Sequence, residues 1–307
     1  MTDPVGGRHL LVTRADVIRA VLADPVTFPP DNALAAVTPI PVAALRILAR
    51  HGFRLPPTLA NNGGASHPAI RGVVADALHP HRVAALRPWL TGVVRRRVTG
   101  LAAALRAGRE VDLHAGLAAD LPLLALGRLV ALPAADTAVV KRFSQAALEL
   151  FWAPLEVARQ RELAEVVGAY DAVLRRFAAT GPGLAARLRA ATADTDVVAG
   201  ALFFLLVAGQ ETTSQFLTLL LHRLAGAPGV AADLAAGRVA DHDVVEEGLR
   251  LTPPIVTWRR LAGRDTTLAG TPVAAGASLV LWLAAAGRDA EEVARPDGFV
   301  PGQRGSR

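Results

Sequence analysis

The sequence contains no cysteine and only one lysine, one tyrosine and one methionine among its 307 residues. Without a thiol, no residue of the chain can form a disulfide, attack as a thiolate or supply a thiolate ligand to a metal. Every basic residue except Lys141 is an arginine, so almost nothing titrates between neutral pH and the arginines. The isoelectric point of about 11.0 therefore follows from composition and does not by itself indicate a nucleic-acid partner.

The arginines are scattered along the chain, and their densest cluster is at residues 95–97. This cluster shares a helical pattern with the apolar Val94, Val98 and Leu101. We interpret it as the solvated face of a helix, with a phosphate-binding patch as the less favoured alternative. The sequence thus predicts no nucleic-acid partner.

Long apolar runs are also missing. The longest, residues 197–209, ends at Gln210 and Glu211 and is shorter than the roughly 20 residues that a bilayer requires. The first residues lack the basic and apolar segments of a secretory signal. These absences predict a cytoplasmic protein without a membrane span, and an apolar fraction of 52% excludes a disordered chain.

Most of the chain has the apolar periodicity of helices, with short polar breaks between them. The predicted helices cover residues 16–22, 42–51, 67–78, 83–107, 117–130, 135–151, 155–179, 182–191, 195–225 and 241–250. Ser66 and Asp194 are predicted as N-caps. Short strands are predicted at residues 255–258, 267–268, 271–273 and 278–282. The predicted fold is mostly α with a small β part, in one domain over residues 1–307.

The longest predicted helix has a polar middle, Ala208-Gly209-Gln210-Glu211-Thr212-Thr213. Glycine inside a helix costs about 1 kcal/mol relative to alanine, and threonine can bond back to a carbonyl and open the helix. One interpretation is a groove where a flat ligand lies against Ala208 and Gly209 while Glu211 and Thr212 handle protons or a water. The other is a glycine that admits a neighbouring helix, and the residues alone favour neither.

Two further pairs lie on common helix faces. His67 and Arg71 are four residues apart, and two cations suit a carboxylate, although a solvated face is the commoner reason for such a pair. Glu247 and Arg250 are three residues apart, but Glu-x-x-Arg pairs occur here as often as composition predicts, so this spacing indicates only a surface ion pair. No combination of residues predicts a metal site, a phosphate loop or a nucleophile elbow.

Six short motifs follow one another in a fixed order along the chain. They are His67-x-x-x-Arg71, Ala208-Gly209-x-Glu211-Thr212-Thr213, Glu247-x-x-Arg250 before Pro253-Pro254, Arg260-x-Ala262, Gly287-Arg288-Asp289 and Phe299-x-Pro301. Each motif is unspecific alone, but the ordered set resembles the cytochrome P450 family, the heme-thiolate monooxygenases, in its soluble bacterial form. The resemblance extends from about His9 to the last residue.

The resemblance implies heme as the cofactor. Five residues match positions that lie against the heme in that family: Ala208 and Gly209, where the long helix crosses the ring, and His67, Arg71 and Arg260, which bind its propionates. The implied fold is a P450-like domain.

The resemblance also implies a reaction, oxygen insertion into a small apolar molecule with electrons from a ferredoxin-type donor. Glu211 and Thr212 match the acid–alcohol pair that delivers protons in this reaction and are the candidate catalytic residues. Glu247 and Arg250 match a buried structural pair.

The sequence departs from the family pattern at both ends. The family's heme-ligand cysteine, its Phe-Gly-rich loop and the helix after it have no counterpart, and the first helix and first strands of the fold are missing. We therefore expect an incomplete domain, truncated at both ends. Near the end, Arg304 stands one place later than the family's arginine, which leaves open the third member of the network around Glu247 and Arg250.

Two functional hypotheses follow. In the first, the chain is a truncated or degenerate monooxygenase that binds heme weakly or not at all and is inactive, since thiolate donation drives the family's chemistry. In the second, it is a heme-free auxiliary protein that binds and activates a natural-product glycosyltransferase, like other cysteine-lacking relatives of the family. The retained His67, Arg71 and Arg260 favour the first hypothesis, because an auxiliary protein has no use for propionate-binding residues.

A missing last helix would also uncover apolar surface. In the family this helix covers part of the long helix that here carries Phe203, Phe204, Leu206 and Leu217. We expect an exposed patch of at least a few hundred Å² there, and a chain that self-associates or is poorly soluble without a partner.

Overall fold

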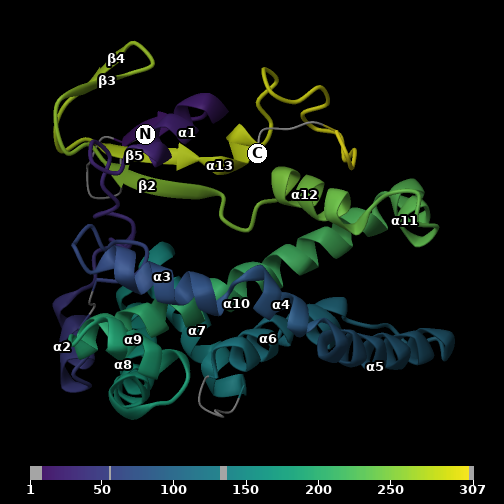
Figure 1. Cartoon of the computed structure of the whole chain (residues 1–307), viewed down its shortest axis with the longest axis horizontal. Coiled ribbons are helices and arrows are strands. Elements are labelled where there is room, and N and C mark those ends of the chain that lie inside the picture. Colours follow the sequence, from purple (N-terminus) through teal and green to yellow (C-terminus); the bar gives the residue numbers. More distant parts are fainter. Residues whose placement is uncertain (1–8, 55–56, 132–136, 304–307) are drawn as a thin grey trace. The chain divides into compact units, whose positions relative to one another are not determined.

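The computed structural model describes residues 9–54, 57–131 and 137–303. The chain divides into two compact units. The helical unit is Leu34–Ser214, and the mixed unit combines Met1–Ala33 with Gln215–Arg307. Figure 1 shows the elements of both. The prediction of a single domain over residues 1–307 stays a prediction.

The helical unit contains nine helical segments and the larger part of a tenth in its described residues. They are α2 (Val42–Arg50), α3 (His67–Ala77), α4 (Pro80–Ala85), α5 (Arg87–Arg106), the π-helical turn η1 (His114–Ala118), α6 (Leu121–Val130), α7 (Thr137–Trp152), α8 (Val157–Thr180), α9 (Leu184–Ala191) and α10 (Thr195–Ala225). Helix α8 packs against α2, α7 and α9. Their buried faces form one apolar core, in which Phe143, Leu150, Leu174, Leu188 and Leu202 are fully buried.

Helix α10 has the bounds that the sequence predicts. Asp194 caps its start, because its carboxylate accepts hydrogen bonds from the backbone N–H groups of Asp196 and Val197 at 2.9 and 3.3 Å. His222 and Arg223 lie in its last turn, where basic side chains complement the helix dipole.

Length and composition alone would let α10 cross a membrane. However, 72% of its most apolar 18-residue window is buried inside the molecule. Core helices of soluble proteins have the same composition, so this one candidate is weak evidence for a span.

The mixed unit adds short strands and further helices. They are β1 (His9–Val12), α1 (Ala15–Ala23), α11 (Pro228–Ala235), α12 (Asp241–Leu251), β2 (Thr257–Leu261), β3 (Thr266–Leu268), β4 (Thr271–Val273), β5 (Ser278–Trp282) and α13 (Leu283–Ala286). One sheet has the order β1-β5-β2, with β1 parallel and β2 antiparallel to β5. Strands β3 and β4 form a hairpin whose turn residues Ala269 and Gly270 both have positive φ, as the tight turn requires.

Two apolar clusters support the mixed unit. One lies at the sheet and α1 and includes Ile18, Val21, Leu279 and Leu281. The other joins the last part of α10 to α12 and is built on Phe216, Leu220 and Val244. Gly248 of α12 allows this second approach, because a Cβ atom there would collide with Leu220.

The predicted fold class, mostly α with a small β part, is confirmed, but several boundaries are wrong. The predicted helix over residues 83–107 is broken between α4 and α5, since Pro88 has no N–H to donate to the carbonyl oxygen of Ala84 one turn earlier. The helix predicted over residues 117–130 starts instead as η1 and restarts at α6, which has Pro122 in its first turn. The strand predicted at residues 255–258 lies at Thr257–Leu261. The predicted helix start at residue 135 lies outside the described residues.

Ser66 precedes α3 as predicted but does not cap it. Its side chain makes no capping bond, and its hydroxyl accepts a hydrogen bond from the Asn62 amide at 3.0 Å.

Three elements have no counterpart in the sequence prediction, namely β1, α11 and α13. Strand β1 forms and pairs His9 with Ser278. Its partner is distant in sequence, so local patterns cannot reveal the pairing. The expectation that the first helix and first strands of the family's fold are missing stays a prediction.

The expectation of an exposed apolar patch on α10 is wrong for Phe203 and Leu206, two of the four residues assigned to it. Phe203 and Leu206 are buried, with 3% and 1% of their surfaces exposed. The ring of Phe203 packs against Phe53, Phe143 and Phe151, so the chain's own residues cover this part of the helix.

Candidate functional site

In the polar middle of α10, the Thr212 side chain is hydrogen-bonded to the backbone of its own helix. The Thr212 hydroxyl donates a hydrogen bond to the carbonyl oxygen of Ala208, one turn earlier, at 2.6 Å. Both residues are half-buried. The hydroxyl proton is therefore engaged within the helix, although the bond runs to a backbone oxygen that a rotation of the side chain would release.

Gly209 lies against α6. A Cβ atom at this position would come 3.3 Å from Cδ2 of Leu126. This close approach agrees with the interpretation of a glycine that admits a neighbouring helix. The interpretation of a flat ligand lying against Ala208 and Gly209 stays a prediction.

Glu211 is buried and paired with Lys141 of α7. The Lys141 ammonium lies 2.6 Å from Oε1 of Glu211, and the Gln210 amide donates to the same oxygen at 3.0 Å. Both charged side chains are largely removed from solvent, with exposed fractions of 13% and 7%. A buried charge of this kind depends on its partner, since the desolvation cost is not recovered without it.

Lys141 is a site residue that the sequence interpretation missed. It is the only lysine in the chain. That rarity was a signal, but no pattern links residue 141 to residue 211 before the fold is known.

His67 and Arg71 lie one turn apart on α3. His67 is half-buried and Arg71 is exposed. Within the part of the chain that the structure describes, neither side chain has a hydrogen-bond or ion-pair partner. This arrangement suits both an anion and a solvated helix face, and the anion-binding role of His67 and Arg71 stays a prediction.

Arg260 lies on β2 in the mixed unit. Burial lowers the pKa of its guanidinium group. Its side chain donates to the carbonyl oxygen of Arg259 at 2.9 Å, and no carboxylate among the described residues is within ion-pair distance. A half-buried cation without a counter-ion is suited to an anionic group of a ligand.

Glu247 and Arg250 form a buried ion pair on α12. Nε and Nη2 of Arg250 donate to the two carboxylate oxygens at 2.7 and 2.8 Å. Glu247, only 4% exposed, also accepts from the backbone N–H of Val300 at 2.8 Å and from the Gln303 amide at 2.6 Å. Burial alone would raise the pKa of Glu247, but these donors outweigh it and leave the pKa below its ordinary value.

Arg250 connects this pair to the last segment of the chain. It donates to the carbonyl oxygens of Gly287, Pro296 and Gly298 at 2.7, 2.7 and 2.8 Å. The surface ion pair predicted from the spacing alone is therefore wrong. The guanidinium is covered by Gly287, Pro296 and Gly298, which follow Arg250 by 37, 46 and 48 positions in the sequence. Gln303 is the third member of the network, and Arg304 lies outside the described residues.

No group of three or more histidine, cysteine, aspartate or glutamate side chains gathers in the described part of the chain. The candidate residues lie on α3, on α10 with Lys141 of α7, on α12 and on β2.

Known proteins with similar sequences and structures share this arrangement of elements. No family model matches the chain. It is 30% identical to the cytochrome P450-SU2 of Streptomyces griseolus over 94% of this chain and 72% of that protein. It is also 30% identical to the erythromycin C-12 hydroxylase of Saccharopolyspora erythraea over 78% of this chain. The solved structure of cytochrome P450 CREJ with (4-ethylphenyl) dihydrogen phosphate covers 98% of the chain with a TM-score of 0.88 and 26% identity.

The matched regions span 61% of the length of the erythromycin C-12 hydroxylase and 76% of the length of P450 CREJ. Identity of 30% with cytochrome P450-SU2, over nearly three quarters of that protein, is accompanied by the same fold in solved P450 structures. The chain therefore belongs to the cytochrome P450 family.

Proposed function

We propose that the chain derives from a heme-thiolate monooxygenase that inserts oxygen into a small apolar molecule, and that these 307 residues alone do not catalyse this reaction. Family membership supports the first part. The second part is carried by one observation, the absence of cysteine from all 307 residues.

Only part of the expected heme environment is available in this chain. His67, Arg71 and Arg260 have no counter-ion among the described residues and can receive propionate groups. Heme bound through a thiolate supplies the oxygen chemistry of the family, and no residue here can supply that ligand. The residues therefore do not fit the complete group, and we derive no catalytic step through it.

The acid–alcohol pair is consistent with a chain that is not active. Glu211 is held by Lys141, and the proton of Thr212 is engaged by the Ala208 carbonyl. Delivery of a proton from this helix would require both groups to leave their present partners.

The remaining partners belong to the proposed parent enzyme. They are a small apolar substrate and a ferredoxin-type electron donor, in the cytoplasm. We propose no nucleic-acid partner and no membrane association for the chain.

Heme titration tests the cofactor part of this proposal. We expect the purified chain to bind heme weakly or not at all, with the absorption spectrum of an adventitious ligand. Propionate contacts near a surface contribute only modestly when axial ligation is missing. The double variant His67→Gln/Arg71→Gln should weaken any residual binding, whereas Arg238→Gln, an exposed arginine elsewhere, should not. Tight, stoichiometric heme in the unmodified chain would contradict the proposal.

The alternative function is a heme-free auxiliary protein that activates a natural-product glycosyltransferase. One observation favours it. Phe203 and Leu206 of α10 are covered by the chain's own residues, as expected of a core that packs without the family's last helix. A glycosyltransferase whose activity rises when the purified chain is added would support this alternative. Activity that does not change would support a degenerate enzyme.

The DNA that follows codon 307 separates the two histories. A frameshifted segment encoding Phe-Gly-x-Gly-x-x-x-Cys would support recent loss from an enzyme. Its absence, together with glycosyltransferase activation, would support an evolved auxiliary protein.

A further inference from the structure

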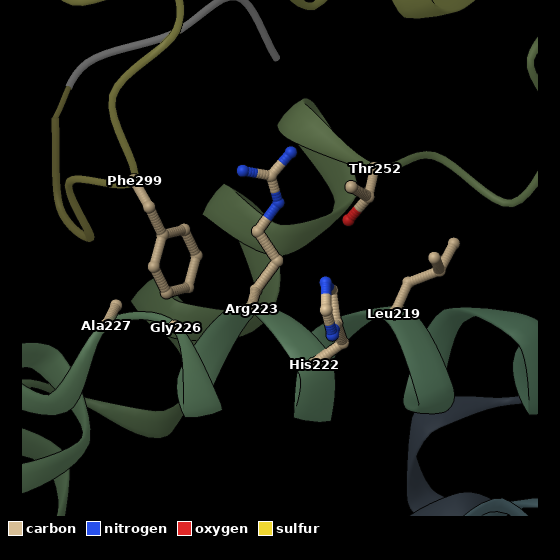
Figure 2. Close-up of a pocket in the computed structure, with 7 residues that line it drawn as sticks. All are labelled: Leu219, His222, Arg223, Gly226, Ala227, Thr252 and Phe299. Atoms are coloured by element: carbon tan, nitrogen blue, oxygen red, sulfur yellow. The ribbon is translucent and has the colours of Figure 1, made fainter.

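A cavity of about 350 Å³ lies in the mixed unit, between the end of α10, the end of α12 and the segment that carries Phe299. Its lining residues are Leu219, His222, Arg223, Gly226, Ala227, Thr252 and Phe299. Figure 2 shows Arg223 extending from α10, with Phe299 on one side and Thr252 on the other. The volume is within the range of small-molecule sites, and a mostly apolar lining with a few polar groups is typical of them.

The wall formed by Phe299 is held in place from both sides. Arg250 donates to the carbonyl oxygen of Gly298 at 2.8 Å, and Glu247 accepts from the N–H of Val300 at 2.8 Å. The Phe299 ring packs against the apolar cluster of α10 and α12. A buried ion pair thus fixes the residues before and after Phe299, so the cavity does not need to form on binding.

The cavity presents positive charge. Arg223 is half-buried, and within the described residues its guanidinium has no hydrogen-bond or ion-pair partner. The guanidinium of an arginine is a cation with five N–H donors and no acceptor, so it is suited to an anionic partner. The adjacent His222 also lines the cavity, and its ring has no partner in the described part of the chain.

Other polar groups of the lining are already engaged. The Thr252 hydroxyl donates to the carbonyl oxygen of Gly248 at 2.9 Å. The backbone N–H groups of Gly226 and Ala227 donate to carbonyl oxygens of the last turn at 3.1 and 3.2 Å. The side chains of Arg223 and His222 are therefore the donors that the described lining has left for a ligand.

The position of these cations on α10 has a simpler explanation as well. Basic residues in a last turn stabilise the helix, and the same helix end repels an anion. Helix stabilisation accounts for the charge, but it does not account for a preformed apolar cavity beside it. A binding measurement therefore distinguishes helix stabilisation from an anion-binding site.

We propose that this cavity binds a small organic anion, a monocarboxylate with a compact apolar or aromatic body. The carboxylate would accept charge-assisted hydrogen bonds from Arg223 and His222, and the body would lie against Leu219, Ala227 and Phe299. This site is independent of the proposed heme chemistry and involves none of the residues assigned to it.

Ligand-observed NMR on the full chain tests the proposal with three probes. Phenylacetate carries both the charge and the apolar body, phenylacetamide carries the body without the charge, and acetate carries the charge without the body. We expect phenylacetate to bind at least about ten times more tightly than either of the others, the change expected from one charge-assisted contact. Equal binding of phenylacetate and phenylacetamide would overturn the proposal, as would no binding of phenylacetate up to about 10 mM.

Two variants and a control locate the binding. Arg223→Gln should weaken phenylacetate binding at least about tenfold, and Phe299→Leu should weaken it while leaving acetate unchanged. Arg238→Gln removes an exposed arginine of the same unit that is paired with Asp233, and it should bind like the parent. Circular dichroism confirms that each variant is folded. Unchanged binding in folded Arg223→Gln would assign these cations to helix stabilisation alone.

Discussion

Glu247 is a carboxylate that is buried and nevertheless ionised. Its charge is compensated by Arg250 and by donors from Val300 and Gln303, and its pKa lies below the ordinary value despite burial. Arg250 also donates to the backbone carbonyl oxygens of Gly287, Pro296 and Gly298. This network therefore ties α12 to the segment of residues 287–303.

The variant Glu247→Gln should lower the unfolding free energy at neutral pH by about 3–5 kcal/mol, because Arg250 is left buried without its counter-ion. The folded-state pKa of Glu247 is below its unfolded value. Its stabilisation is therefore present above the unfolded value and is lost as pH falls through the folded one. Urea unfolding at neutral pH and at successive acidic steps should show a steeper loss in the parent than in the variant.

The control for this prediction is Asp233→Asn, which breaks an exposed pair with Arg238 and should cost less than about 1 kcal/mol. Parallel pH dependence in the parent and in Glu247→Gln would mean that Glu247 does not supply the acid-sensitive stabilisation.

Lys141 and Glu211 form the second buried pair. Lys141→Met leaves the Glu211 carboxylate without its counter-ion, and we expect a loss of about 3–5 kcal/mol in unfolding free energy. The double variant Lys141→Met/Glu211→Leu removes both charges and should be closer to the parent than the single variant. Arg50→Met breaks an exposed pair with Glu165 and serves as the control, since it should cost less than about 1 kcal/mol. If Lys141→Met costs no more than Arg50→Met, the pair is not a buried one.

At the scale of elements, the contact between α6 and α10 depends on Gly209. Gly209→Val places a branched side chain where Leu126 lies, and overpacking should cost about 1–3 kcal/mol. Leu126→Ala makes space, so the double variant should cost less than the sum of the two single losses. Chemical denaturation of the four proteins measures this coupling. Gly100→Val on α5 has open space around its Cβ and should not be destabilised by crowding. Strictly additive losses would rule out the contact.

The sequence predicted elements where the determining residues are local. Asp194 and the apolar run after it locate α10, whereas the predicted helix over residues 83–107 overlooks the break that precedes Pro88. Strand β1 was missed because its stability depends on pairing His9 with Ser278, far along the chain. Local signals therefore locate the long helices, but they miss the short helices α11 and α13 and the non-local pairing of β1.

For the candidate site, too, the sequence identified residues within one element but not their partners from other elements. The short motif of α10 and the Glu247–Arg250 spacing identified residues within single helices. Their partners Lys141 and Gln303 come from other elements, and only the fold brings them into contact. Burial changed the meaning of the Glu247–Arg250 spacing, since spacing alone does not distinguish a surface pair from a core pair.

The solubility of the molecule depends on apolar side chains at its surface, and α5 is a long helix that carries several of them. In its 20 residues it buries only Val93, and it exposes Val98 and Leu105 at 46% and 55%, seven positions apart on one face. The helix also carries five arginines and no acidic residue. Apolar surface favours self-association, while like charges oppose it until salt screens them.

We therefore expect the chain to self-associate, and to do so more strongly as ionic strength rises. Val98→Gln/Leu105→Gln should reduce association and hydrophobic-dye binding, measured by sedimentation and fluorescence. Val26→Gln changes an isolated residue that is 81% exposed and should have little effect. If the parent is monodisperse and binds little dye at high salt, α5 does not mediate self-association. That result would favour the auxiliary-protein alternative.

The central claim is that a chain of the cytochrome P450 family, lacking any cysteine in these 307 residues, does not form a thiolate-ligated heme. The reduced-CO difference spectrum of the purified chain, recorded after addition of heme, tests this claim most directly. We predict no band at the position of thiolate-ligated heme, and at most a band typical of an adventitious nitrogen ligand. A band at the thiolate position, in proportion to the protein present, would contradict the account.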